Sequence, residues 1–440
     1  MILFGHPHAK LPVTTQLLGR KKSCFNNYHY ICGLIDNLQT LFKKKMDALK
    51  KIMKSLLGLV VGCACGFGAV MLIRWLADGG KPIVEKTSEG TDYGLLALCI
   101  FLAFIFLIVG TIIHLIIHEA GHLVTGLLTG YRFLSFRVFK FTLAKTDDGL
   151  KWKRFHISGT GGQCLMELPE DQDVNTAPWF WYNAGGVLMN LLLAFISILI
   201  LRNIPVGIVA FSFFIMLAFV GIGMALINGL PIVAGGLGND GYNILSLWKY
   251  PELRRYFVHT LQIAGQLSRG KRMREMPGEW MEDIPVNKDC KMLELGNRIN
   301  YMALLEDQGR MEEAMDVANE IMSLGRKLPQ LYQMEVGGER VMLELLTSKN
   351  TEKIDEQWTK QLERYILLNS KYSPIKCAIL YSYELIYRHD KEKAETYRQS
   401  LLLHQNDYAM PGEARTAISL VETAMALDRL KIEQAEKSSL

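Results

Sequence analysis

The chain has 440 residues, with 49 Lys and Arg, 44 Asp and Glu, and a formal net charge of +5. This weak positive charge without a basic cluster excludes a nucleic-acid-binding protein, and the 50% hydrophobic content excludes a disordered chain. The last 190 residues carry 57 of the charges, whereas Arg202 is the only charged residue between Asp173 and Asp240. A soluble domain rarely leaves so long a stretch uncharged. We therefore predict a membrane part followed by a soluble part.

The uneven charge divides the chain into three predicted parts. Residues 1–54 form a basic N-terminal segment, residues 55–250 a membrane core, and residues 251–440 a soluble helical domain. The first 45 residues have no hydrophobic periodicity and precede methionines that make more natural starts, so we expect residues 1–45 to be an over-extended reading frame. The predicted fold class is mostly α: a polytopic membrane core with about four spans, a small membrane-associated β-hairpin and an all-α C-terminal domain.

Four apolar stretches are long enough to cross a bilayer as helices, which takes about 20 residues. They cover approximately residues 55–76, 95–117 (continuing as helix to about 129), 180–201 and 206–230. Basic residues concentrate in segment 1–54 and in the loop 130–173, whereas residues 77–92 hold two basic and four acidic side chains. Because positive loops stay inside, we expect both termini in the cytosol. The chain is predicted to be a multi-pass protein of the cell membrane.

Residues 131–168 are neither a span nor an ordinary linker. Aromatic and basic residues alternate on both sides of Asp147-Asp148-Gly149, which marks a turn, and this pattern is typical of a β-hairpin lying on the membrane surface. The glycines at 159, 161 and 162 indicate a further tight turn. An open strand edge could hold an extended substrate by strand addition. The alternative is a hairpin that only caps the spans, and the sequence leaves both open.

The sequence His118-Glu119-Ala120-Gly121-His122 stands at the cytosolic end of the second predicted span. In H-E-x-x-H on a helix, both imidazoles lie on one face and can bind one zinc ion. The carboxylate between them can then act as a general base toward an attacking water. The alternative is a set of polar side chains that only reach the membrane interface at a helix end. His114, one turn earlier, is expected to be a packed residue rather than a ligand.

A third ligand should come from another cytosolic helix end. Asp240 is the first charged residue after Arg202 and is expected at the same level as His118. It would complete a site of two histidines and one carboxylate, leaving the open position that a catalytic zinc needs. The alternative is that Asp240-Gly241 is only a turn in a glycine-rich loop. Glu167, in the preceding loop, is a less favoured third ligand.

Over about residues 93–250 the chain resembles the site-2 protease family of intramembrane zinc metalloproteases. This family places H-E-x-x-H in its first core helix, Gly-Pro-x-x-Asn in the second, and Asn-x-x-Pro followed by Asp-Gly at the third. The matching residues here are His118, Glu119, His122, then Gly186 and Asn190, then Asn228, Pro231, Asp240 and Gly241. Val187 replaces the family's proline, and Pro231 and Asp240 are nine positions apart, which is longer than the usual family spacing.

The resemblance implies a function for these positions. It assigns His118, His122 and Asp240 as zinc ligands and Glu119 as the general base. Asn190 and Asn228 would bind the substrate or orient the site. The expected activity is zinc-dependent hydrolysis of a peptide bond in or near a transmembrane segment of a membrane-anchored protein. The alternative, favoured by the long Pro231–Asp240 spacing, is a catalytically inactive membrane scaffold or partner-binding protein on the same fold.

The region 251–440 is charged and rich in helix-forming residues. Two pairs of amphipathic helices are predicted, Met292–Gln308 with Met311–Leu324 and Ser373–Arg388 with Lys391–Leu403. Paired helices of this kind resemble tetratricopeptide hairpins, which stack into a concave binding surface. A plain helical bundle is the alternative. Because no catalytic motif is present in this region, we expect it to bind a protein partner or a substrate tail, or to gate access.

Overall fold

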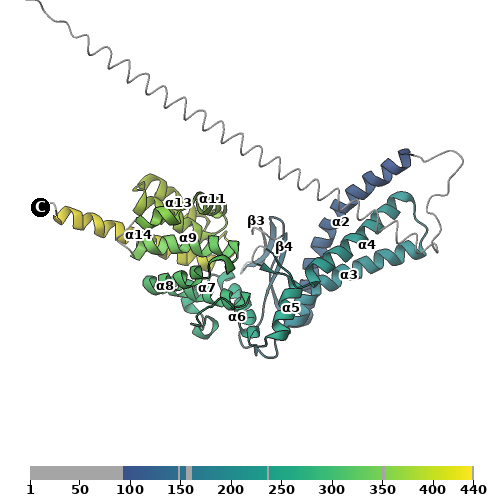
Figure 1. Cartoon of the computed structure of the whole chain (residues 1–440), viewed down its shortest axis with the longest axis horizontal. Coiled ribbons are helices and arrows are strands. Elements are labelled where there is room, and N and C mark those ends of the chain that lie inside the picture. The colour runs from purple at the N-terminus through teal and green to yellow at the C-terminus, as the bar shows by residue number, and fades with distance from the viewer. Residues whose placement is uncertain (1–92, 147–148, 155–160, 235–236, 348–351, 439–440) are drawn as a thin grey trace, which may run out of the picture. The chain divides into compact units, whose positions relative to one another are not determined.

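The computed structural model describes residues 93–440, except 147–148, 155–160, 235–236, 348–351 and 439–440. This part of the chain is mostly helical, with thirteen α-helices and a small antiparallel four-stranded sheet (Figure 1). The mostly-α fold class is therefore confirmed at this level. The predicted segment 1–54 and the first predicted span, residues 55–76, lie outside the described residues.

Three helices are long and apolar enough to cross a membrane. They are α2 (Tyr93–Leu128), α3 (Trp179–Asn203) and α4 (Ile208–Gly229), and they correspond to the second, third and fourth predicted spans. Large apolar side chains point outward along them, such as Leu128 (80% exposed), Phe195 (57%) and Ile227 (63%). The helix contacts instead bury small or polar residues of α3, including Ala184, Gly185, Gly186, Asn190, Ala194 and Ser197. Small residues inside and large apolar residues outside are typical of helices packed in lipid.

A four-residue link makes α3 and α4 neighbours. Ile204, which follows α3, is extended at φ −120° and ψ 122°, as expected for a residue before proline. Pro205 and Gly207 then lead into α4. The chain therefore reverses at once and α4 packs back along α3, as the short link predicts.

The segment between α2 and α3 forms more strands than the predicted hairpin has. The strands β1 (Arg132–Val138), β2 (Phe141–Thr146), β3 (Gly149–Arg154) and β4 (Gly162–Glu167) pair in the order β3-β2-β1-β4, all antiparallel. The predicted turn Asp147–Gly149 falls between the paired strands β2 and β3, and its first two residues lie outside the described part of the chain. The turn at Phe139–Lys140 was not predicted. Phe139 has a φ of 54°, a left-handed conformation that a bulky residue adopts only rarely, so its residue type gives no turn signal. The predicted turn over the glycines 159, 161 and 162 lies partly outside the described residues, and β4 begins at Gly162.

Ten further helices follow α4 in the described part of the chain. They are α5 (Asp240–Lys249), α6 (Leu253–Ser268), α7 (Met292–Asp307), α8 (Met311–Ser323), α9 (Gln330–Thr347), α10 (Glu352–Gln357), α11 (Lys360–Asn369), α12 (Pro374–Ser382), α13 (Lys391–His404) and α14 (Pro411–Ser438). The four helices predicted in this region correspond to α7, α8, α12 with the π-turn Tyr383–Tyr387, and α13. Gly309, at φ 78°, separates α7 from α8.

One apolar cluster holds the sheet against the first soluble helices. Met166 of β4, Leu247 of α5 and Val258 of α6 are each completely buried in it. At its border, Nη1 of Arg269 lies 2.6 Å from a carboxylate oxygen of Glu167 at the end of β4. This packing fixes α5 next to β4, and therefore also fixes the start of α5, where Asp240 lies.

Candidate metal centre

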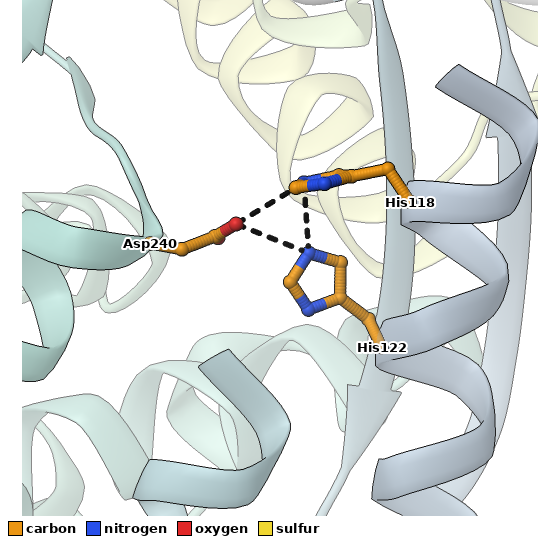
Figure 2. Close-up of side chains that lie close together, drawn as sticks. All are labelled: His118, His122 and Asp240. Atoms are coloured by element: carbon orange, nitrogen blue, oxygen red, sulfur yellow. Dashed lines mark hydrogen bonds and ion pairs between the residues drawn. The ribbon is translucent and has the colours of Figure 1, made fainter. Parts of the chain in front are cut away.

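Three side chains from two helices meet near the end of α2. His118 and His122 project from α2 and Asp240 projects from the first turn of α5 (Figure 2). The Nε2 atoms of His118 and His122 are 3.2 Å apart. Oδ2 of Asp240 lies 3.1 Å from Nε2 of His118 and 3.5 Å from Nε2 of His122. The structure thus brings together the three residues that were predicted as metal ligands.

The tautomer of His122 follows from its second contact. Its Nδ1 lies 2.7 Å from the backbone carbonyl oxygen of Tyr182 in α3. A carbonyl can only accept, so Nδ1 carries a proton, and in the neutral ring Nε2 holds the lone pair that faces the cluster. The Tyr182 ring is itself held by stacking on Tyr131 at 4.8 Å and by a 2.8 Å hydrogen bond from its hydroxyl to the Cys164 carbonyl. Such an outer contact is what a metal-bound histidine ordinarily makes.

Asp240 is placed by the residue that precedes it. Asn239 caps α5, accepting from Tyr242 N at 2.9 Å and from Ile232 N at 3.1 Å. Its amide nitrogen donates to the carbonyls of Ile227 at 2.6 Å and Leu230 at 2.7 Å. One side chain therefore ties the end of α4 to the start of α5. Sequence analysis missed Asn239, although an Asn before a helix is a recognised capping signal.

The three converging atoms fit a metal ion. Oδ2 of Asp240 is buried and lies within 3.5 Å of Nε2 of both histidines, so all three atoms face one point. Ligands bound tetrahedrally to zinc at about 2.0–2.1 Å are about 3.3 Å from one another, close to the separations found here. Two imidazoles and one carboxylate are also a donor set that zinc accepts in catalytic sites.

Glu119 lies between the histidines in sequence and is held from the side by β4. The backbone N–H of Cys164 faces its carboxylate. A methyl group on Gly162 would lie 2.5 Å from Glu119 Oε1, so β4 can approach the carboxylate this closely only with glycine at that position. Burial, helped by the charge of Glu119, raises the pKa of the Cys164 thiol to about 12. Without a metal ion the thiol is therefore protonated near neutral pH.

Arg137 is a second residue that the sequence analysis did not single out. It is 1% exposed in β1, and its guanidinium donates to the carbonyls of Phe139 at 3.0 Å and Gly162 at 3.3 Å. Burial lowers its pKa, while the charge of Glu119 acts in the opposite direction. Arg137 therefore links the β1–β2 turn to β4 and puts a positive charge near Glu119. Alternating aromatic and basic residues gave no signal that this arginine is buried.

The other predicted residues take different places. The Asn190 amide lies 3.1 Å from His118 Nδ1, so it contacts a residue of the cluster. His114 contacts Asn190 and the Leu217 carbonyl, and it is a packed residue outside the cluster, as expected. Asn228 donates to the carbonyl of Met224 one turn earlier in its own helix, and its role toward substrate stays a prediction. Glu167, the less favoured ligand, pairs with Arg269 instead.

Comparisons with protein-family models, curated proteins and solved structures found no match. The resemblance to the site-2 protease family therefore rests on the motifs and their spacing.

Proposed function

We propose that this protein is a zinc-dependent intramembrane endopeptidase of the site-2 protease type. Its substrate would be a membrane-anchored protein, cut in or near a transmembrane segment. The observation that carries the proposal is the convergence of His118, His122 and Asp240, with Glu119 beside them, near the end of an apolar helix. Placing charged side chains in an apolar span costs free energy, so such residues usually mark a functional site.

Each residue has a separate role in this proposal. His118, His122 and Asp240 would hold the zinc ion through the three atoms that converge. Bound zinc supplies a Lewis acid that polarises the scissile carbonyl and makes water nucleophilic near neutral pH. Glu119 accepts a proton from the attacking water and later gives it to the leaving amine. The Cys164 N–H holds the Glu119 carboxylate toward the site while this happens.

At Cys164 the sheet contacts the general base Glu119, so it does not offer a free strand edge to a substrate there. At Cys164, β4 pairs with β1 on one side, while on the other side the Cys164 N–H faces Glu119 and the Cys164 carbonyl accepts a hydrogen bond from the Tyr182 hydroxyl. An extended substrate cannot pair with these two groups without displacing the site residues. The helical segment to be cut must still unwind, because hydrogen bonds shield a helical carbonyl. We therefore place any strand addition away from Cys164.

The inactive-scaffold alternative was favoured by the long spacing between Pro231 and Asp240. The intervening residues form a small antiparallel ladder of β5 (Val233–Ala234) and β6 (Leu237–Gly238). Together with the contacts of Asn239, this ladder returns the chain to the end of α4. The spacing therefore does not keep Asp240 from the histidines, and it gives no further support to the alternative.

The remaining parts of the proposal concern location and partners. We place the protein in the cell membrane, with four spans and both termini in the cytosol. The C-terminal helices would bind a protein partner or the substrate tail, in the manner of tetratricopeptide hairpins. In this proposal the neighbouring pairs α7–α8 and α12–α13 would be the units of such an array.

Cleavage of a membrane-anchored reporter in intact cells tests the enzyme proposal. Glu119→Gln should lower the rate by roughly 10²–10⁴, the magnitude of general-base catalysis, and still bind zinc. The His118→Ala variant should lose both reporter cleavage and zinc binding. Asn203→Ala is the control, because Asn203 lies at the far end of α3 and bonds only within its own helix. Cleavage unchanged by Glu119→Gln and His118→Ala would reject the enzyme and leave the scaffold.

A further inference from the structure

A buried hydrogen-bonded chain connects three helices behind the candidate metal centre. His114 of α2 is completely buried, and its Nε2 lies 2.9 Å from the carbonyl oxygen of Leu217 in α4. Its Nδ1 lies 3.0 Å from the side-chain amide of Asn190 in α3. That amide also lies 3.1 Å from Nδ1 of His118. The chain therefore runs from Leu217 through His114 and Asn190 to a predicted zinc ligand.

The proton of His114 can be assigned from these contacts. The Leu217 carbonyl only accepts, so Nε2 of His114 carries a proton. A second proton on Nδ1 would give a cation that is fully buried, and no acidic side chain in the described part of the chain pairs with it. Such an unpaired buried charge is strongly unfavourable. His114 is therefore neutral, and its Nδ1 is an acceptor.

The orientation of the Asn190 amide follows next. The coordinates place its Oδ1 toward His114 and its Nδ2 toward His118, but the two atoms have the same shape and only the hydrogen bonds distinguish them. Because Nδ1 of His114 accepts, the amide NH₂ must face His114. The amide oxygen then faces His118 and accepts the proton of its Nδ1.

We propose that His114 is a positioning residue that acts through Asn190 to keep His118 in the tautomer that offers its Nε2 lone pair to the metal. This inference rests on the proposed zinc function. In the opposite arrangement, Nε2 of His118 would carry the proton and could donate to Asp240, which satisfies the cluster without a metal. The buried hydrogen bond from His114 to the Leu217 carbonyl thus determines which nitrogen of His118 carries the proton. With the proton on Nδ1 the site can bind a metal, and with the proton on Nε2 it forms a hydrogen bond to Asp240 instead. Gly221 of α4 makes room for the ring, since a methyl group there would lie 2.5 Å from His114 Cε1.

Zinc affinity of the purified full chain in detergent tests the coupling. Competition with a chromogenic chelator should show that His114→Leu and Asn190→Leu each lower the zinc affinity by roughly 10–100-fold, as do substitutions of other residues that orient metal ligands. Asn190→Asp should stay within a few-fold of wild type, because either carboxylate oxygen accepts from His118. Asn203→Leu is the matched control, since Asn203 lies on the same helix and outside the chain of bonds.

The double variant His114→Leu with Asn190→Asp separates positioning from packing. An aspartate needs no orienting partner, so zinc affinity should no longer depend on His114 in that background. A His114→Leu loss that persists there would show a packing effect and overturn the inference. Circular dichroism of each variant establishes that it is folded before affinity is compared.

¹⁵N-histidine NMR of the metal-free protein gives a readout that needs neither zinc nor cleavage. His114, assigned by the signal lost in His114→Leu, should be neutral with the proton on Nε2. A doubly protonated His114, or one protonated only on Nδ1, overturns the inference. If the wild-type chain binds no zinc while His114 has the expected form, the proposed function fails instead.

Discussion

The backbone N–H of Cys164 in β4 faces the carboxylate of Glu119 in α2. This contact crosses from the sheet to the apolar helix that carries both histidines. Glu119 is therefore positioned by two elements: α2 sets its height along the helix axis, and β4 sets the direction of its carboxylate. The sheet thus takes part in the candidate site, although none of its residues belongs to the His118–His122–Asp240 cluster.

Gly162→Ala should separate catalysis from metal binding. The added methyl group would lie 2.5 Å from Glu119 Oε1, so the carboxylate or β4 must move. A displacement of about 1 Å at a catalytic group can cost on the order of 10²-fold in rate, whereas His118, His122 and Asp240 are not touched. We expect reporter cleavage to fall by roughly 10–100-fold, with zinc affinity measured by chelator competition unchanged.

The neighbouring glycine supplies the control for this experiment. A methyl group on Gly161 would meet only the flexible side chain of Leu115, at 3.4 Å, so Gly161→Ala should cleave as wild type does. Equal rates for Gly161→Ala and Gly162→Ala would show that β4 does not set the position of Glu119.

Asn239 should control both the stability of the α4–α5 junction and the affinity for zinc. Asn239→Ala removes the cap of α5 and all four hydrogen bonds of the side chain. The loss of a helix cap alone costs about 0.5–2 kcal/mol, and Asp240 loses the residue that places it. We expect a lower thermal midpoint and weaker zinc binding, measured by differential scanning fluorimetry with and without zinc.

Asn239→Asp divides these two effects. Aspartate keeps the acceptor that caps α5 but cannot donate to the carbonyls of Ile227 and Leu230. The midpoint without zinc should therefore lie between those of wild type and Asn239→Ala. Wild-type behaviour of both variants would mean that packing alone places Asp240.

Much of this site could be predicted because it depends on local periodicity. His118 and His122 are four apart on a helix, and the uncharged stretches fixed α2, α3 and α4 nearly to the residue. Asp240 was identified as the first charge after a long uncharged stretch. Each of these inferences needs only the chain near the residue in question.

The parts that were missed depend on contacts between distant segments. Nothing around Arg137 indicates that its charge is buried near Glu119, since the same alternation also fits an exposed strand. The turn at Phe139 uses a left-handed conformation that the residue type disfavours. β4 begins at Gly162, in a run of glycines that reads as a turn, and its pairs with β1 are separated by 24 residues at Val138–Gly162 and by 35 at Arg132–Glu167. Such contacts are set by the tertiary fold and leave no pattern in the sequence.

Removal and return of zinc should change the stability of the wild-type chain. A ligand that binds only the folded state stabilises it by about 2.7 kcal/mol at a hundredfold excess over its Kd. The thermal midpoint should therefore fall after chelation and recover with added zinc. His118→Ala, His122→Ala and Asp240→Ala should each abolish the recovery, because each removes one of the three converging ligands.

An exposed histidine provides the control for the zinc series. His404, at the end of α13, pairs with Asp407 on the surface, and His404→Ala should recover as wild type does. A zinc response that needed His404 but not His118 would place the metal at the surface and leave the cluster without an ion.

The C-terminal helices should lose stability as pH rises through neutrality. Burial, followed by the charge of Glu335, raises the pKa of Glu339 to about 8. Burial also raises the pKa of Glu413 to about 7, against the opposing charge of Lys376. Each carboxyl therefore binds a proton in the folded state at a pH where the unfolded chain has released it. The stabilisation that each protonated carboxyl gives the folded state is present at about pH 5 and is lost toward pH 8. The free energy of unfolding falls by up to about 1.4 kcal/mol per pH unit for each of the two carboxyls.

Hydrogen exchange of α9 and α14, which carry these two residues, measures the effect within the full chain. After correction for the intrinsic pH dependence of exchange, protection in both helices should decrease from pH 5 to pH 8. Glu339→Gln and Glu413→Gln each stay neutral and should flatten this decrease. Protection that rises with pH in the wild type would mean that the carboxyls are ionised when folded, with Lys376 outweighing their burial.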